Sequence, residues 1–172
     1  LFGDRMLIAN ATGCSSIYGG TYPTCPYSKD KDGFGPSWAN SLFEDNAEFG
    51  YGMAIARRNE RKNFIEKLKT KKFGKKITEL LVPFFKNTED HAYNRTLTIE
   101  LKKYRRGHIL RADESYLYDN LGLIISPSVW IFGGDGWAYD IGFGGLDHVV
   151  ASGENVNILI LDTEVYSNTG GQ

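Results

Sequence analysis

Three short apolar runs without polar alternation mark the chain, at residues 6–10, 129–132 and 157–161. Such runs are typical of strands that are buried on both faces of a parallel sheet. Between the second and third runs, residues 137–152 can form a crossover helix that ends at Gly153. This order of strand, helix and strand predicts an α/β fold with an open, mostly parallel sheet and helices on both faces.

Apolar side chains recur at helical spacing through the middle of the chain. Between Trp38 and Met53 this spacing predicts a helix over residues 41–58. Further helices are expected at residues 59–86 with a break near 73–74, at 94–106 and at 114–121. Residues 57–126 therefore form a helical, charge-rich middle region, within what we expect to be a single domain over residues 1–172.

The composition is that of one ordinary globular domain, with 172 residues of which 41% are hydrophobic. Twenty Lys and Arg residues nearly balance 21 Asp and Glu residues, so the net charge predicts no nucleic-acid or membrane partner. The balance hides a basic run, because residues 57–76 contain ten basic and two acidic residues. Such a run is commonly the solvated face of a surface helix.

The chain contains two cysteines, Cys14 and Cys25. Two are too few for a disulfide scaffold and fit a reducing compartment. No apolar run approaches the roughly 20 residues that a membrane-spanning helix needs, and no signal-peptide pattern opens the chain. Because the sequence starts without methionine and stops soon after a strand signal, we expect it to be a piece of a longer protein.

Polar residues follow two of the predicted strands. Gly134, Asp135 and Gly136 come after the run at 129–132, and residues 162–168 come after the run at 157–161. Because parallel strands end at the same edge of a sheet, we expect the two segments to meet there. Glycines and a helix N-terminus at such an edge suit a diphosphate group. The same residues are also compatible with a simple tight turn from strand to helix.

The carboxylate of Asp135 would repel a diphosphate unless a cation lay between them. Magnesium prefers about six oxygen ligands, and Asp135, the Thr163 hydroxyl and the main-chain carbonyl of Val165 could supply part of that shell. A dinucleotide fingerprint is the competing interpretation, but Tyr139 occupies the position that its third glycine requires. The sequence therefore favours a metal-bridged diphosphate.

The sequence Gly-Gly-Asp-Gly-Trp within residues 129–148, together with Asp-Thr-Glu-Val-Tyr-Ser-Asn within residues 161–172, resembles the thiamine diphosphate domain of the pyruvate:ferredoxin (flavodoxin) oxidoreductases. Residues 8–16, with Ala-Thr-Gly-Cys-Ser-Ser, and residues 35–49 resemble the same family. The resemblance extends over the whole chain. It implies a thiamine diphosphate-binding fold in an enzyme that oxidatively decarboxylates pyruvate to acetyl-CoA and carbon dioxide, with electrons passing through [4Fe-4S] clusters to ferredoxin or flavodoxin.

The resemblance also implies roles by position. Asp135, Thr163 and the main-chain oxygen of Val165 would hold magnesium, and Asn168 would face the substrate as a catalytic residue. Cys14 would bind the [4Fe-4S] cluster nearest the cofactor and would touch the thiamine, although taken alone a cysteine is more often a small buried hydrophobic residue. The residues lining thiamine diphosphate would be Cys14, Gly134, Asp135, Gly136, Trp137, Thr163, Glu164, Val165, Tyr166, Ser167 and Asn168.

Several parts of such an enzyme would have to come from outside this sequence. A [4Fe-4S] cluster needs four thiolates, which two cysteines cannot supply. In the family, the other cluster ligands lie upstream and downstream, and the glutamate that activates the thiamine ring belongs to another domain. We therefore expect the chain by itself to be inactive.

The resemblance further implies pyruvate and coenzyme A as substrates, ferredoxin or flavodoxin as electron acceptor, the remaining domains of the parent chain as partners, and a homodimer. It implies a cytoplasmic location, or an anaerobic organelle in a eukaryote. On this view the basic run at residues 57–76 could instead steer an acidic electron carrier such as ferredoxin. Two other functions stay open: an oxidoreductase for a different 2-oxoacid, and a non-catalytic paralogue that acts as an interaction module.

Overall fold

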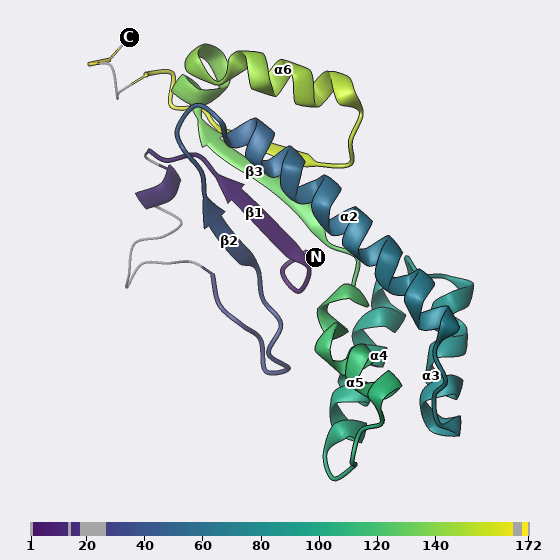
Figure 1. Ribbon diagram of the computed structural model, residues 1–172. Coiled ribbons are helices and arrows are strands. Elements are labelled where there is room, and N and C mark those ends of the chain that lie inside the picture. The colour runs from purple at the N-terminus through teal and green to yellow at the C-terminus, as the bar shows by residue number, and fades with distance from the viewer. Residues whose placement is uncertain (1, 14, 18–26, 167–169, 172) are drawn as a thin grey trace. The chain divides into compact units, whose positions relative to one another are not determined.

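A computed structural model describes residues 2–13, 15–17, 27–166 and 170–171 of the chain (Figure 1). The chain divides into two compact units, one formed by Leu1–Ala56 with Pro127–Gln172 and the other by Arg57–Ser126. We call them the sheet unit and the helical unit, and describe each by itself. The expectation of a single domain over residues 1–172 stays a prediction.

The sheet unit is built on four parallel strands in the order β2-β1-β3-β4. Figure 1 shows β1 and β3 side by side at the centre of this sheet. The strands are β1 (Met6–Asn10), β2 (Ser37–Asn40), β3 (Ser128–Gly134) and β4 (Asn157–Leu161). The α/β class and the open parallel sheet expected from the sequence are confirmed.

One face of the sheet is covered by α6 (Phe143–Ser152) and by residues 46–56 of α2 (Asn46–Thr70). Side chains of both helices pack with Ile131 of β3 in one core cluster. Helix α2 approaches β3 closely at Gly50, where an added Cβ would lie 2.4 Å from Cγ1 of Ile131. The register places Ile8, Phe132 and Leu159 together on the opposite face.

The connection from β3 to β4 is the predicted crossover. A π-helical turn at Trp137–Ile141 leads into α6, which ends at Gly153 in the left-handed conformation with φ of 67°. Glycine adopts this conformation without the steric cost that a Cβ imposes, which makes it the common residue after a helix. The crossover helix and its glycine stop are confirmed.

Two expectations about the sheet unit were wrong. Residues 41–45 are not helical, because α2 begins at Asn46, and Trp38 lies on the short strand β2. Four residues carry too little local pattern to show a strand, and only pairing with β1 defines this one. The run at 157–161 is not buried on both faces, because β4 is an edge strand whose Leu159 and Leu161 are 38% and 37% exposed.

The helical unit contains the remainder of α2 and further helices: α3 (Lys75–Lys86), α4 (His91–Arg105), α5 (Ala112–Asp119) and a 3₁₀ turn (Leu121–Leu123). Its core joins Phe64 of α2, Phe84 of α3, Leu101 of α4 and Leu117 of α5, all at most 1% exposed. These helices agree with those expected from the apolar spacing, including the break after residue 70. No helix in the described ranges is both long and apolar enough to cross a membrane.

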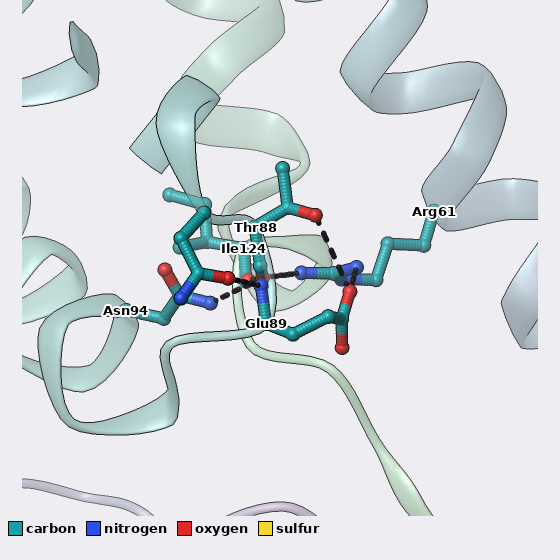
Figure 2. Close-up of polar contacts among 6 residues, drawn as sticks. Arg61, Thr88, Glu89, Asn94 and Ile124 are labelled. Atoms are coloured by element: carbon teal, nitrogen blue, oxygen red, sulfur yellow. Dashed lines mark hydrogen bonds and ion pairs between the residues drawn. The ribbon is translucent and has the colours of Figure 1, made fainter. Parts of the chain in front are cut away.

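A buried arginine organises the polar interior of the helical unit (Figure 2). The guanidinium of Arg61 forms an ion pair with Glu89 at 2.6 Å and donates hydrogen bonds to the carbonyl oxygens of Thr88 and Ile124. The amide of Asn94 donates to the same Thr88 carbonyl at 2.7 Å. Arg61 therefore ties α2 to the loop before α4 and to the end of the 3₁₀ turn.

Candidate functional site

The carboxyl ends of β3 and β4 place two loops next to each other. Gly134, the last residue of β3, pairs in register with Leu161, the last residue of β4. A cavity of about 710 Å³ opens beside these two strand ends. Its walls are mostly apolar and also include residues 11–13 at the end of β1. A cavity at this edge is where open α/β sheets usually bind ligands.

Asp135 is the central polar group of this edge. Its carboxylate accepts hydrogen bonds from the backbone N–H groups of Thr163 at 2.7 Å and of Val165 at 3.1 Å. Burial raises the pKa of Asp135, but hydrogen bonds from its own backbone N–H, from Thr163 and from Val165 outweigh that effect and lower the pKa below its usual 3.8. The carboxylate is therefore ionised at neutral pH and ties the loop after β4 to the loop after β3.

Three oxygen-bearing groups meet at this edge: the carboxylate of Asp135, the hydroxyl of Thr163 and the carbonyl of Val165. The Oγ1 of Thr163 lies 3.1 and 3.3 Å from the two carboxylate oxygens of Asp135, and 3.4 Å from the carbonyl oxygen of Val165. Neighbouring ligands of an octahedral magnesium ion, each about 2.1 Å from the metal, are about 3.0 Å apart. The distances from the Thr163 hydroxyl to the other two groups are therefore close to those between neighbouring ligands of a magnesium ion.

This set contains a single carboxylate. Within the described part of the chain, no group of three or more His, Cys, Asp or Glu side chains is arranged to hold a metal ion. A cation at Asp135 would therefore need the hydroxyl, the carbonyl and further oxygens from a ligand or water. Magnesium commonly takes such a mixed set, with one or two carboxylates and the phosphates of its ligand.

The loop after β4 is held in one shape by a second set of hydrogen bonds. Glu164 has φ of 63°, a left-handed conformation that is uncommon for residues with a side chain. Its backbone N–H donates to the carboxylate of Asp162 at 2.9 Å, and the hydroxyl of Tyr139 donates to the same carboxylate at 3.0 Å. No local pattern indicates the Tyr139–Asp162 contact, which exists only because the two loops are neighbours.

Tyr166 packs directly on the glycine turn. An added Cβ at Gly136 would lie 2.2 Å from two ring carbons of Tyr166, so this contact requires glycine. Phe43 also stacks with this ring, at a centroid distance of 5.8 Å. Both aromatic rings line the cavity.

A buried polar network fixes the other side of the cavity. The amide of Asn10, which is 1% exposed, donates to the carbonyl of Ala11 at 2.7 Å and to the hydroxyl of Ser15 at 3.2 Å. Asn46 at the start of α2 donates to the carbonyl of Phe132 at 2.8 Å. We missed this network from the sequence, although a polar residue that ends an apolar strand, as Asn10 does, is a usable signal.

The structure brings most of the residues expected at the site to one place. Six of them line the cavity: Gly134, Asp135, Gly136, Thr163, Val165 and Tyr166. Glu164 lines an adjoining hollow of about 460 Å³ instead. Trp137 is fully buried in the core of the sheet unit and does not line the cavity. Cys14, Ser167 and Asn168 lie outside the described residues.

Comparison with curated proteins finds relatives along the entire chain. The chain is 51% identical to pyruvate:ferredoxin oxidoreductase from Moorella thermoacetica and 51% identical to pyruvate-flavodoxin oxidoreductase from Rhodospirillum rubrum, with all of the chain aligned in both cases. It is 44% identical to pyruvate dehydrogenase [NADP(+)] from Cryptosporidium parvum, again over all of the chain. No protein-family model matches the chain.

The chain is a homologue of one segment of the pyruvate:ferredoxin and pyruvate-flavodoxin oxidoreductases. It spans 16% of the Moorella protein, 15% of the Rhodospirillum protein and 11% of the Cryptosporidium protein. The names of these three relatives all include pyruvate, but each names a different electron acceptor. The resemblance to this family that the sequence suggested is thereby confirmed.

Proposed function

We propose that the chain is the cofactor-binding segment of a pyruvate oxidoreductase, which converts pyruvate and coenzyme A to acetyl-CoA and carbon dioxide. We further propose that the carboxyl edge of its sheet binds thiamine diphosphate through a magnesium ion. Pyruvate is favoured over other 2-oxoacids because all three relatives are named for it. The observation that carries the proposal is the cluster of three oxygens from Asp135, Thr163 and Val165 beside a glycine turn.

Several features of the site fit this cofactor. The cavity volume of about 710 Å³ lies within the range usual for small-molecule sites. Next to it, the backbone at Gly134 presents no side chain that would keep a phosphate away, and an added Cβ there would meet the Leu161 carbonyl at 3.8 Å. The carboxylates of Asp135 and Asp162 lie at this edge, so a bare diphosphate would be repelled. A magnesium ion held by Asp135, Thr163 and Val165 would neutralise that repulsion.

When bound, thiamine diphosphate supplies a carbon nucleophile and an electron sink for the decarboxylation of pyruvate. The residues of this chain would position the cofactor and exclude water. Leu159, Leu161 and Phe132 form apolar walls, and Tyr166 forms a flat aromatic wall. Such walls lower the local dielectric and strengthen the electrostatic interactions made at the site. Asn168 would face the substrate.

The route of the electrons is also part of the proposal. Cys14 would supply one of the four thiolates of a [4Fe-4S] cluster, and the other three would come from outside this chain. The electrons would pass to ferredoxin or flavodoxin, the acceptors named in the two bacterial relatives. The parent protein would act as a homodimer.

Titration of thiamine diphosphate into the full-length parent protein tests the proposal, with and without magnesium. We expect Asp135→Asn to weaken magnesium-dependent binding by more than the ~10–100-fold that loss of an outer partner of a metal ligand costs. Asp147→Asn is the matched control, because Asp147 is an exposed carboxylate on α6 in the same connection and lines neither the cavity nor the adjoining hollow. Binding that does not depend on magnesium, or equal losses in the two variants, would contradict the assignment.

A further inference from the structure

The charges of the chain are segregated between its two units. The helical unit carries 17 of the 20 Lys and Arg residues and 9 of the 21 Asp and Glu residues, which gives it a formal charge of +8 and leaves −9 for the sheet unit. Residues 77–126 contain seven basic and seven acidic residues and are neutral. The whole positive excess of the helical unit therefore lies in residues 57–76, on α2 and at the start of α3.

Some of these basic residues stabilise the helical unit itself. Arg57 pairs with Glu60, Arg61 pairs with Glu89, and Lys71 pairs with Asp113. A second group is exposed and forms no ion pair within the described ranges: Lys62, Lys69, Lys72, Lys75 and Lys76. We call this group the lysine surface. Its charges are available to a partner.

The lysine surface follows the chain from α2 into α3. Lys62 and Lys69 are seven residues apart on α2, which places them on the same side of the helix. That side lies away from Phe64 and Leu68, which are both 1% exposed and face the core. Lys72, Lys75 and Lys76 follow within the next seven residues, around the turn into α3.

Two of these lysines interact unfavourably with the dipole of their own helix. Lys75 and Lys76 lie in the first turn of α3, which contains no acidic residue. Because the N-terminus of a helix carries a partial positive charge, a lysine there is unfavourable by some tenths of a kcal/mol. The N–H of Gly74 at this end already bonds to Glu114. The dipole of α3 therefore does not account for two lysines at this position.

We propose that the lysine surface is the docking surface for an acidic protein, and that this protein is the electron carrier of the proposed function, on which the inference rests. A cluster of like charges attracts a partner of opposite charge and raises its association rate by roughly 10–1000-fold. Opposite charges face each other as the two proteins approach, so the surface selects carriers with acidic faces. The competing occupants are a nucleic acid and the acidic sheet unit of a second copy of this chain.

Steady-state kinetics of the full-length protein with acidic ferredoxin or flavodoxin as electron acceptor test this proposal. In Lys75→Glu/Lys76→Glu we expect the KM for the carrier to rise about tenfold at low salt, with unchanged turnover of pyruvate when a small neutral quinone is the acceptor. At 1 M salt the difference should vanish, because charges are then screened beyond about 3 Å. The melting temperature should be no lower than that of the wild type, because the substitutions complement the helix dipole.

The matched control is Lys29→Glu/Lys31→Glu, which changes the net charge equally but lies in the sheet unit, on two exposed lysines. An equal rise in KM for this control would overturn the proposal, because net charge and not the lysine surface would then act. An unchanged KM in Lys75→Glu/Lys76→Glu would also overturn it, as would a loss of self-association or of DNA binding without an effect on the carrier. If the wild type does not oxidise pyruvate with the quinone, the proposed function fails instead.

Discussion

The contact between Gly136 and Tyr166 offers the sharpest test of the site. In Gly136→Ala the new Cβ would lie 2.2 Å from two carbons of the Tyr166 ring and 2.8 Å from a third. Carbon atoms in ordinary contact are about 3.5–4.0 Å apart, so the ring has to retreat by roughly 1.5 Å. Phe43 stacks on the same ring and restricts its rotation out of the way.

This retreat acts on the candidate magnesium ligands. Val165, the neighbour of Tyr166, donates its N–H to Asp135 at 3.1 Å, and a shift of more than 1 Å breaks that bond. Overpacking costs about 1–3 kcal/mol, and a hydrogen bond to a charged group contributes about 1.5–3 kcal/mol, less where water competes. We take about 2 kcal/mol as the net loss, which corresponds to a roughly 30-fold weaker affinity for thiamine diphosphate with magnesium.

A double-mutant cycle in the full-length protein measures this effect. We expect Gly136→Ala to cost roughly 30-fold in affinity in the wild type and little in the Tyr166→Ala background, where the obstructing ring is absent. Amide hydrogen exchange of the loop at Thr163 and Val165 should increase in Gly136→Ala. Gly134→Ala is the matched control for exchange, because its Cβ would meet only the Leu161 carbonyl, at an ordinary 3.8 Å. An undiminished penalty in the Tyr166→Ala background would refute the steric reasoning.

Two further expectations concern the scaffold, and both can be followed by hydrogen exchange in the full-length protein. Gly50→Ala should lower the free energy of opening of α2 by about 1–3 kcal/mol, because its Cβ would lie 2.4 Å from Ile131. Gly52→Ala has open space for its Cβ and should raise the same free energy by about 0.5–1 kcal/mol. A change of the same sign in both variants would contradict the packing described. Burial raises the pKa of Glu89, but its interactions with Arg61 and neighbouring hydroxyls outweigh this and hold the pKa below its usual 4.5. The stabilisation by Glu89 should therefore be complete above about pH 4.5 and fade as the pH falls through the lowered pKa. Glu89→Gln should lose at most about 1 kcal/mol at pH 7, because the side chain is largely exposed, and progressively less as the pH falls through the lowered pKa of Glu89; a loss that does not diminish with falling pH would argue against a charge effect.

Much of the fold could be predicted from local patterns. Residues 6–10 and 129–132 form strands, and the amphipathic segments of the helical unit form helices, because burial of regularly spaced apolar side chains fixes both kinds of element. Gly153 ended the crossover helix as expected, since few other residues adopt its left-handed conformation. These elements depend on neighbours within a few residues along the chain.

The expectations that proved wrong concern strands whose structure depends on residues far away in the sequence. Strand β2 is only four residues long and exists through its pairing with β1, so its apolar residues were mistaken for part of a helix. The apolar run of β4 suggested burial on both faces, but its place at the edge of the sheet leaves Leu159 and Leu161 facing the cavity. Hydrophobicity shows that a residue avoids water, and does not show which neighbour, or which ligand, covers it.

The sequence by itself determined the class of fold, the two strand ends that carry the candidate ligands and the homology to pyruvate oxidoreductases. It did so because strand patterns, glycine turns and carboxylates are local features, and because sequence identity is read directly. Only the tertiary structure decided that Thr163 and Val165 close around Asp135, that Tyr166 packs on Gly136, and that Trp137 lies in the core. The contacts at Asp135 and Gly136 join residues 28 to 30 positions apart, and those of Trp137 reach residues much farther away. Their geometry depends on strand register and side-chain packing, which no local pattern encodes.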